Sequence, residues 1–263
     1  MSIYNSDQSY LNVVNNDKVS VVQINHFSSG ERVDNGSGCL VKYKSNYYIF
    51  TAAHVLDPWI EEKVSITVEG VDIDISTPKV SLTSKNIDGG WIKLEENQRK
   101  TIQLNLAKRF KKPVADSENI YIQIYQNQEE LKDEDIVHCY GYPGKLIGYY
   151  PDNLASHEGK VRSVSWGAMP GLFAVTIEGE GEGEGEEGYY QVAGKATFKE
   201  YEDVIKNGET KPQLRKGGNS GGPIMYVSGQ FSRFAGIISM EYRIEEGFYG
   251  IHLNTILEHI ESM

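Results

Sequence analysis

The chain of 263 residues carries a formal net charge of −11, so it has no excess of basic side chains to neutralise nucleic-acid phosphates. Hydrophobic residues make up 39% and charged residues 24%, a balance typical of a soluble globular protein and not of a disordered chain. No uninterrupted apolar run approaches the length of a membrane-spanning helix. The composition therefore predicts a protein without nucleic-acid or membrane partners.

The first part of the chain is a series of short apolar or alternating segments of strand length. A basic, proline-containing stretch at 108–113 follows them and has the composition of a connector. We therefore place a domain boundary there, between 1–113 and 114–263. The strands predicted in the first domain are 18–24, 38–43, 47–52, 63–68, 71–75, 91–94 and 101–106.

The second part of the chain repeats this pattern and ends in a different one. Helical periodicity appears only near the C-terminus, where Asn254 is the expected cap of a helix over about 255–262. Many short strands followed by one terminal helix predict an all-β protein built of packed β-barrels. The strands predicted here are 120–125, 136–140, 160–165, 172–177, 189–193, 223–226, 234–240 and 247–252.

An acidic run at 178–188 contains six glutamates and five glycines. Dense like charge with interspersed glycine has too little apolar area to order itself, so we expect a mobile hairpin tip or insertion between two strands. The alternative is an acidic docking loop or a cation site, because closely spaced carboxylates can chelate.

Only two cysteines occur, Cys39 and Cys139, and each lies in a predicted apolar strand. Two reduced core thiols are the expected state, since a secreted protein of this size usually carries several disulfide bridges. The first residues also lack the basic and apolar regions of a secretory signal. These features favour an intracellular, cytoplasmic location.

The most informative local segment is GGNSGGP at 217–223, which places Ser220 among glycines. Acyl transfer by serine needs a hydroxyl on a tight turn with backbone N–H groups converging on the oxyanion, and glycines permit that close approach. A phosphate-binding loop is the alternative, but no Gly-Lys-Ser/Thr pattern follows and the next segment has the pattern of a strand.

A second segment, FTAAHVL at 50–56, places His54 directly after an apolar strand with two small residues beside it. Such a histidine on its own is more often structural than catalytic. Small neighbours, however, allow close packing against the imidazole, whose pKa suits proton transfer near neutral pH.

These two segments resemble the hallmark segments of the trypsin-like serine peptidases. They also occur in that family's order, histidine before serine with an aspartate between, which differs from the order in subtilisins and α/β-hydrolases. The resemblance extends from about residue 21 to the C-terminal helix. Further segments that resemble the family are GSG at 36–38, DGGWIKL at 88–94, GYPG at 141–144 and GIIS at 236–239.

The resemblance implies two packed six-stranded antiparallel β-barrels and a triad of Ser220 as nucleophile, His54 as general base and Asp88 as the carboxylate that orients it. Relatives usually have a β-branched residue and alanine after this aspartate, where the present chain has Gly89 and Gly90.

Three other aspartates lie near the histidine in sequence. Asp57 is expected to begin a turn, and Asp72 and Asp74 lie on an alternating strand with a solvated face. The oxyanion hole is expected from the N–H groups of Gly218 and Ser220, and no metal or organic cofactor is needed.

The same resemblance indicates the substrate pocket. Leu214 takes the position of the aspartate that selects basic residues in trypsin, while Ser239, Met240 and Glu241 lie on the wall of the cleft. An apolar or small P1 residue is therefore favoured. Glu241 stands where relatives often have glycine, and its carboxylate would either narrow the pocket or attract a basic group. Asn219 cannot form the ion pair of cleavage-activated relatives, so we expect no zymogen activation.

These features predict a serine endopeptidase that hydrolyses peptide bonds through an acyl-enzyme, with narrow specificity or gating suited to the cytoplasm. Its partners would be a protein or peptide substrate and an activating or regulatory protein. The alternative is a catalytically silent pseudoprotease that acts as a binding module. A lipase-like hydrolase fits poorly, because the serine lacks a strand-to-helix setting.

Overall fold

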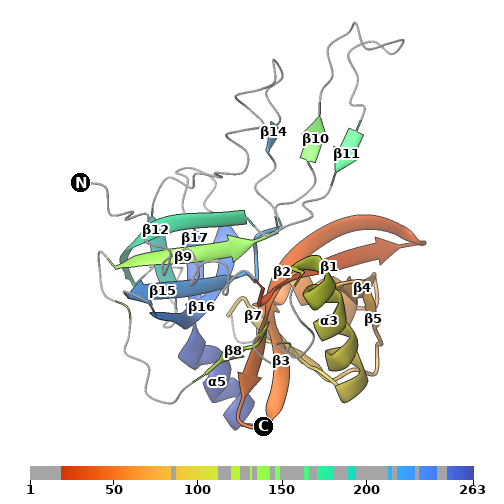
Figure 1. Cartoon of the computed structure of the whole chain (residues 1–263), viewed down its shortest axis with the longest axis horizontal. Helices are drawn as coiled ribbons and strands as arrows, with labels where there is room; N and C mark the ends of the chain where they lie inside the picture. Colours follow the sequence, from red (N-terminus) through yellow and green to blue (C-terminus); the bar gives the residue numbers. More distant parts are fainter. Residues whose placement is uncertain are drawn as a thin grey trace, which may run out of the picture.

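A computed structural model shows two β-sheet assemblies side by side, and the helices of the described part of the chain pack on them (Figure 1). No helix within the residues described below is long and apolar enough to cross a membrane. The structure describes residues 19–83, 87–111, 120–124, 131, 135–142, 146–148, 163–165, 171–180, 189–193, 213–214, 218–228, 231–241 and 248–263.

The first assembly is an eight-stranded sheet in the order β5-β4-β1-β2-β3-β7-β6, with β8 pairing in parallel with β2. All its other pairs are antiparallel, and the inward side chains of the central strands are fully buried. Its strands are β1 (Val21–Ser28), β2 (Glu31–Tyr43), β3 (Asn46–Ala52), β4 (Ser65–Val68), β5 (Val71–Ile73), β6 (Lys79–Ser81), β7 (Gly89–Lys93) and β8 (Ile122–Gln123).

The second assembly is a closed six-stranded barrel in the order β12-β13-β17-β16-β15-β9. Its strands are β9 (Ile136–Gly141), β12 (Gly171–Glu180), β13 (Tyr189–Ala193), β15 (Pro223–Ser228), β16 (Phe231–Glu241) and β17 (Phe248–His252). A separate three-stranded sheet is formed by β10 (Leu146–Gly148), β11 (Ser163–Ser165) and β14 (Gln213–Leu214). The prediction of an all-β fold of two packed sheet units is confirmed, although the first unit is an eight-stranded sheet with a parallel edge pair and not a six-stranded antiparallel barrel.

The domain boundary after residue 113 stays a prediction, and β8 bears on it. Ile122 pairs with Val41 of β2, so a strand from the 114–263 segment completes the first sheet. The acidic run is described only up to Glu180, and its remainder lies outside the described residues. The strands that it joins, β12 and β13, pair antiparallel, in agreement with a hairpin.

Among the described residues the helices are α2 (Ala53–Ile60), α3 (Glu96–Arg109) and α5 (Leu253–Glu261). The prediction of a strand at 101–106 was wrong, because this segment lies inside α3. Ile102 and Leu106 are buried at helical spacing while Leu104 between them is 42% exposed, and a capping box joins Glu95 to Gln98. The terminal helix is confirmed.

Asn254 is not the cap of α5, because the helix begins at Leu253, two residues before the predicted start, and has His252 in the N-cap position. The short helix α2 was not predicted from the sequence. It contains Pro58, which removes one backbone donor, and only Ala53, Val55, Leu56 and Trp59 of its eight residues are buried.

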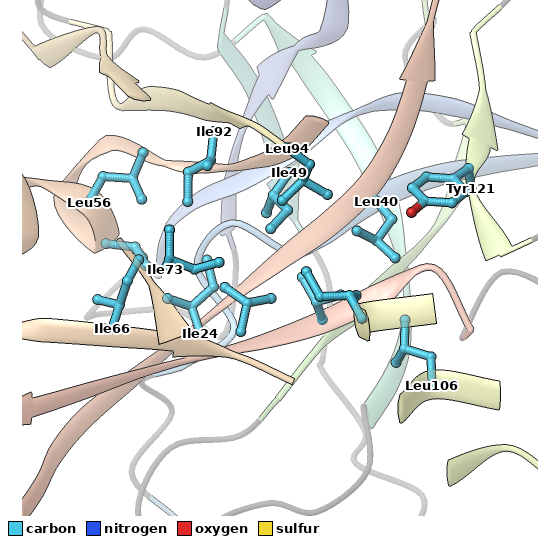
Figure 2. Packing of buried hydrophobic residues seen from close by; sticks show 14 of the residues in the cluster. Ile24, Leu40, Ile49, Leu56, Ile66, Ile73, Ile92, Leu94, Leu106 and Tyr121 are labelled. Carbon is cyan, nitrogen blue, oxygen red and sulfur yellow. The ribbon is translucent and has the colours of Figure 1, made fainter. Parts of the chain in front are cut away.

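The described residues form two hydrophobic clusters that stabilise the fold. One packs the first sheet against α2 and α3, and Figure 2 labels ten of its members: Ile24, Leu40, Ile49, Leu56, Ile66, Ile73, Ile92, Leu94, Leu106 and Tyr121. The other joins the sheet to the barrel, since Phe50 and Trp91 of the sheet share it with Phe234 and Ile237 of the barrel and Ile256 of α5. Both cysteines, Cys39 and Cys139, are free and buried, as predicted.

An ionic cluster around the buried carboxylate of Glu69 also links these two assemblies. Arg109 of α3 lies 2.5 Å from Glu69 Oε2 and donates at 2.6 Å to the hydroxyl of Tyr142, the residue that follows β9. Glu69 Oε1 also accepts from the backbone N–H of Gln23 at 2.7 Å. Burial raises the pKa of Glu69 although Arg109 and these hydrogen bonds oppose the rise.

We expect Arg109→Met to destabilise the protein by about 3–5 kcal/mol at neutral pH, because it leaves the buried Glu69 carboxylate without its cation. Removing Arg109 raises the folded-state pKa of Glu69 further. A raised folded-state pKa gives stability that is present at low pH and is lost as the pH rises through that pKa. Denaturant unfolding should therefore show a larger deficit at pH 8 than at pH 5.

The matched control is Lys100→Met, which breaks the exposed pair between Lys100 and Glu96 on the same helix. Its unfolding midpoint should stay near that of the wild type at both pH values. An equal and pH-independent loss in both variants would contradict the role of the ionic cluster.

Candidate active site

His54 is the second residue of α2, at the point where β3 ends against the start of β7. The backbone N–H of His54 donates to Asp88 Oδ1 at 2.9 Å, and that of Ala53 donates to the Asp88 carbonyl at 3.0 Å. A Cβ at Gly90 would lie 3.0 Å from Leu56 Cδ1, so glycine lets the start of α2 pack closely on β7. Gly90 thus has a packing reason, whereas a Cβ at Gly89 would meet only ordinary van der Waals contacts, the nearest at 3.4 Å.

Asp88 binds the imidazole of His54 through both carboxylate oxygens. Nδ1 lies 2.8 Å from Asp88 Oδ2 and 3.0 Å from Oδ1, and the hydroxyl of Ser239 donates to Oδ2 at 2.6 Å. Because a carboxylate only accepts, Nδ1 carries the proton and Nε2 keeps its lone pair. The His54 side chain is 51% exposed and that of Asp88 18%.

The surroundings of His54 raise its pKa above the usual value. Burial alone would lower the pKa, but the hydrogen bond and the charge of Asp88 outweigh it, and Asp57 and Asp34 add smaller charge effects. Asp88 therefore stabilises the protonated His54, which is the form that His54 takes when it accepts a proton as a general base.

The other aspartates weighed in the sequence have different partners. Asp57 accepts from the hydroxyls of Ser81 and Thr83, and Asp74 accepts from the backbone and hydroxyl of Ser76. Asp72 lies in β5 opposite Thr67. Asp88 is the aspartate that binds His54.

Ser220 lies in the turn that leads into β15, between two glycines with positive φ, Gly218 at 99° and Gly221 at 87°. A Cβ at Gly221 would lie 2.1 Å from Thr51 Oγ1 and 2.2 Å from the Ser37 carbonyl oxygen, so no other residue fits. The turn is anchored by Gly221 N–H, which donates to the Ile238 carbonyl at 2.6 Å. The barrel strand that carries Ser239 therefore also holds the serine turn.

The residues predicted for the substrate pocket fall in two places. Ser239 to Glu241 lie in β16 of the barrel, whereas Leu214 lies in β14 of the three-stranded sheet, which Figure 1 shows outside the barrel. Ser239 is fully buried and its hydroxyl donates a hydrogen bond to the Asp88 carboxylate, so this side chain positions the carboxylate. The pocket assignment as a whole stays a prediction.

Ser37 was not assigned a role from the sequence, although the GSG segment was singled out. Its backbone N–H donates to the Ser220 carbonyl at 2.9 Å and its hydroxyl to the Gly218 carbonyl at 2.6 Å. The sequence signal that could have indicated this role is a small polar residue between two glycines. Among the described residues, no cluster of three or more His, Cys, Asp or Glu side chains is placed to hold a metal ion.

No protein-family model and no curated protein sequence matches the chain. Among solved structures it is similar to a serine endoprotease from Yersinia pestis, with a TM-score of 0.54 and 17% identity over 98% of this chain and 67% of that one. It is similar to Deg5 with a TM-score of 0.54 and 15% identity, over 98% of this chain and 95% of that one. The chain has the trypsin-like serine peptidase fold, the chymotrypsin fold.

Proposed function

We propose that this protein is a serine endopeptidase with Ser220, His54 and Asp88 as its triad. The observation that carries the proposal is the contact of both Asp88 oxygens with His54 Nδ1, at 2.8 and 3.0 Å. This contact leaves Nε2 as the free base and stabilises the imidazolium. The glycine-rich turn supports the proposal, because it presents Ser220 on close backbone contacts that larger residues could not make.

In the proposed reaction His54 Nε2 accepts the proton of Ser220 Oγ as that oxygen attacks the carbonyl carbon of a peptide bond. The N–H groups of Gly218 and Ser220 would stabilise the oxyanion. The C–N bond then breaks as Nε2 returns the proton to the leaving amine, and an acyl-enzyme forms. Water, deprotonated by the same nitrogen, releases the acyl group and restores Ser220.

The substrate in this proposal is a protein or peptide. Leu214 at the position expected for the pocket base supports a small or apolar P1 residue, to which Met240 and Glu241 would add the wall. A cytoplasmic setting belongs to the same proposal and is supported by the two free, buried cysteines. Narrow or gated specificity, with an activating partner, is the part of the proposal that suits such a setting.

The proposal is tested with a fluorophosphonate probe, which reacts with activated serines. We expect the folded protein to be labelled and peptide mapping to place the label on Ser220, whereas heat-unfolded protein should stay unlabelled. A well-folded wild type without label at Ser220 would shift the weight to the pseudoprotease alternative. The labelled enzyme is then profiled on a mixed peptide library, where cleavage after Arg or Lys alone would contradict the P1 assignment.

A further inference from the structure

Ser37 is a fully buried residue of β2. Its polar atoms form hydrogen bonds with the turn that carries Ser220 or with residues packed against that turn. The glycines beside it allow this close approach. A Cβ at Gly36 would lie 2.5 Å from the Val55 side chain, and one at Gly38 would lie 2.7 Å from that of Ile49. The GSG segment therefore brings one hydroxyl into a space that admits no larger neighbours.

The direction of the Ser37 hydroxyl is determined by its two partners. The backbone N–H of Tyr142, which can only donate, lies 2.8 Å from Ser37 Oγ. The oxygen must accept there, so its own hydrogen points to the Gly218 carbonyl at 2.6 Å. The Ser37 carbonyl in turn accepts from Thr51 Oγ1 at 2.6 Å, which holds the Ser37 backbone in place.

Ser37 thus holds the carbonyl groups of two residues, Gly218 through its hydroxyl and Ser220 through its backbone N–H at 2.9 Å. These are the residues whose own N–H groups form the proposed oxyanion hole. Gly218, with a φ of 99°, lacks the Cβ that would otherwise restrict its rotation. The hydrogen bond from the Ser37 hydroxyl restrains the backbone rotation of Gly218, which the glycine cannot restrain by itself.

We propose that Ser37 is a positioning residue for the oxyanion hole, an inference that rests on the peptidase function proposed above. Without its hydroxyl, the Gly218 carbonyl loses its partner and the peptide planes on either side of Gly218 can turn. The N–H groups would then no longer converge on the oxyanion. Because an oxyanion forms only in the transition state, the loss should appear in kcat and not in KM.

The experiment compares Ser37→Ala and Ser37→Cys with wild type on a peptide substrate. We expect Ser37→Ala to lower kcat by about 10²-fold, the scale of one oxyanion donor, with KM nearly unchanged. Ser37→Cys keeps a side-chain donor at this position, although the thiol is a weaker donor and a somewhat larger group than the hydroxyl, so its kcat should fall between the two. If Ser37→Ala does not fold, Ser37→Cys carries the test.

The matched control is Thr77→Ala, which deletes another buried hydroxyl, one that accepts from Gln98 Nε2 at 2.9 Å. This variant should lower the melting temperature and leave kcat unchanged. An unchanged kcat in both Ser37 variants, a rise in KM alone, or an equal kcat loss in Thr77→Ala would each overturn the positioning role.

Hydrogen exchange separates this inference from the peptidase proposal. The N–H groups of Gly221 and Gly222 are bonded to the carbonyls of Ile238 and Asn219, so their exchange reports on the order of the turn. If the wild type neither labels nor cleaves, the proposed function fails and exchange decides the role of Ser37. Faster exchange at these amides in Ser37→Ala than in Thr77→Ala would support the inference that Ser37 orders the turn. Equal exchange in the two variants would overturn that inference.

Discussion

Ser220→Ala and His54→Ala are each expected to lower kcat by about 10⁶-fold, and the double variant is expected to be no slower than either single one. The reason is that the two side chains act as one unit. Without Ser220 there is no hydroxyl for His54 to deprotonate, and without His54 the serine remains a weak nucleophile. Burst kinetics and steady-state turnover of an activated ester and a peptide amide would measure this.

Residual turnover above the uncatalysed rate should persist in all three variants, because the oxyanion donors and substrate binding remain. Ser65→Ala, which removes an exposed hydroxyl from β4, is the control and should keep wild-type kcat. Single-variant losses that multiply in the double variant would mean that His54 and Ser220 act independently, and would rule out the triad.

The strands were predictable from the sequence where a run of strand length is buried along its whole length, on both faces of the sheet. In β3 the pattern of burial follows the apolar run directly, from Tyr48 to Ala52. The segment 101–106 misled because Ile102, Leu104 and Leu106 alternate like a strand, while in the helix the residues at 102 and 106 share the buried face. The capping pair of Glu95 and Gln98 was the sequence signal that would have corrected it.

The residues of the candidate site were predictable only where a single short segment of sequence indicates the reactive group. His54 and Ser220 stand in segments whose small residues and glycines already indicate close packing around a reactive group. The role of Ser37 could not be read there, because its partners Tyr142 and Gly218 are 105 and 181 residues away in the chain. Such hydrogen bonds depend on how the sheet and the barrel meet, which no local pattern specifies.

Asp88→Asn is expected to lower kcat by about 10⁴-fold with little loss of fold. Asp88 accepts from His54 N–H, His54 Nδ1 and Ser239 Oγ, and asparagine has one carbonyl oxygen for all of them. If that oxygen keeps the backbone N–H, the amide N–H₂ faces Nδ1 and donates to it. The proton of the imidazole then moves to Nε2, which can no longer act as a base.

The pH dependence gives a second readout of the same change. Activity requires neutral His54, so in the wild type it rises with pH through a pKa that Asp88 holds above the usual value. Removing that charge lowers the pKa of His54, and the acidic limb of kcat/KM should move to lower pH in Asp88→Asn even as the plateau falls.

The matched control is Asp57→Asn, whose carboxylate binds Ser81 and Thr83 and adds only a smaller charge effect at His54. It should leave the plateau nearly unchanged. A similar fall in both variants would show that general negative charge, and not the Asp88 contact, supports His54.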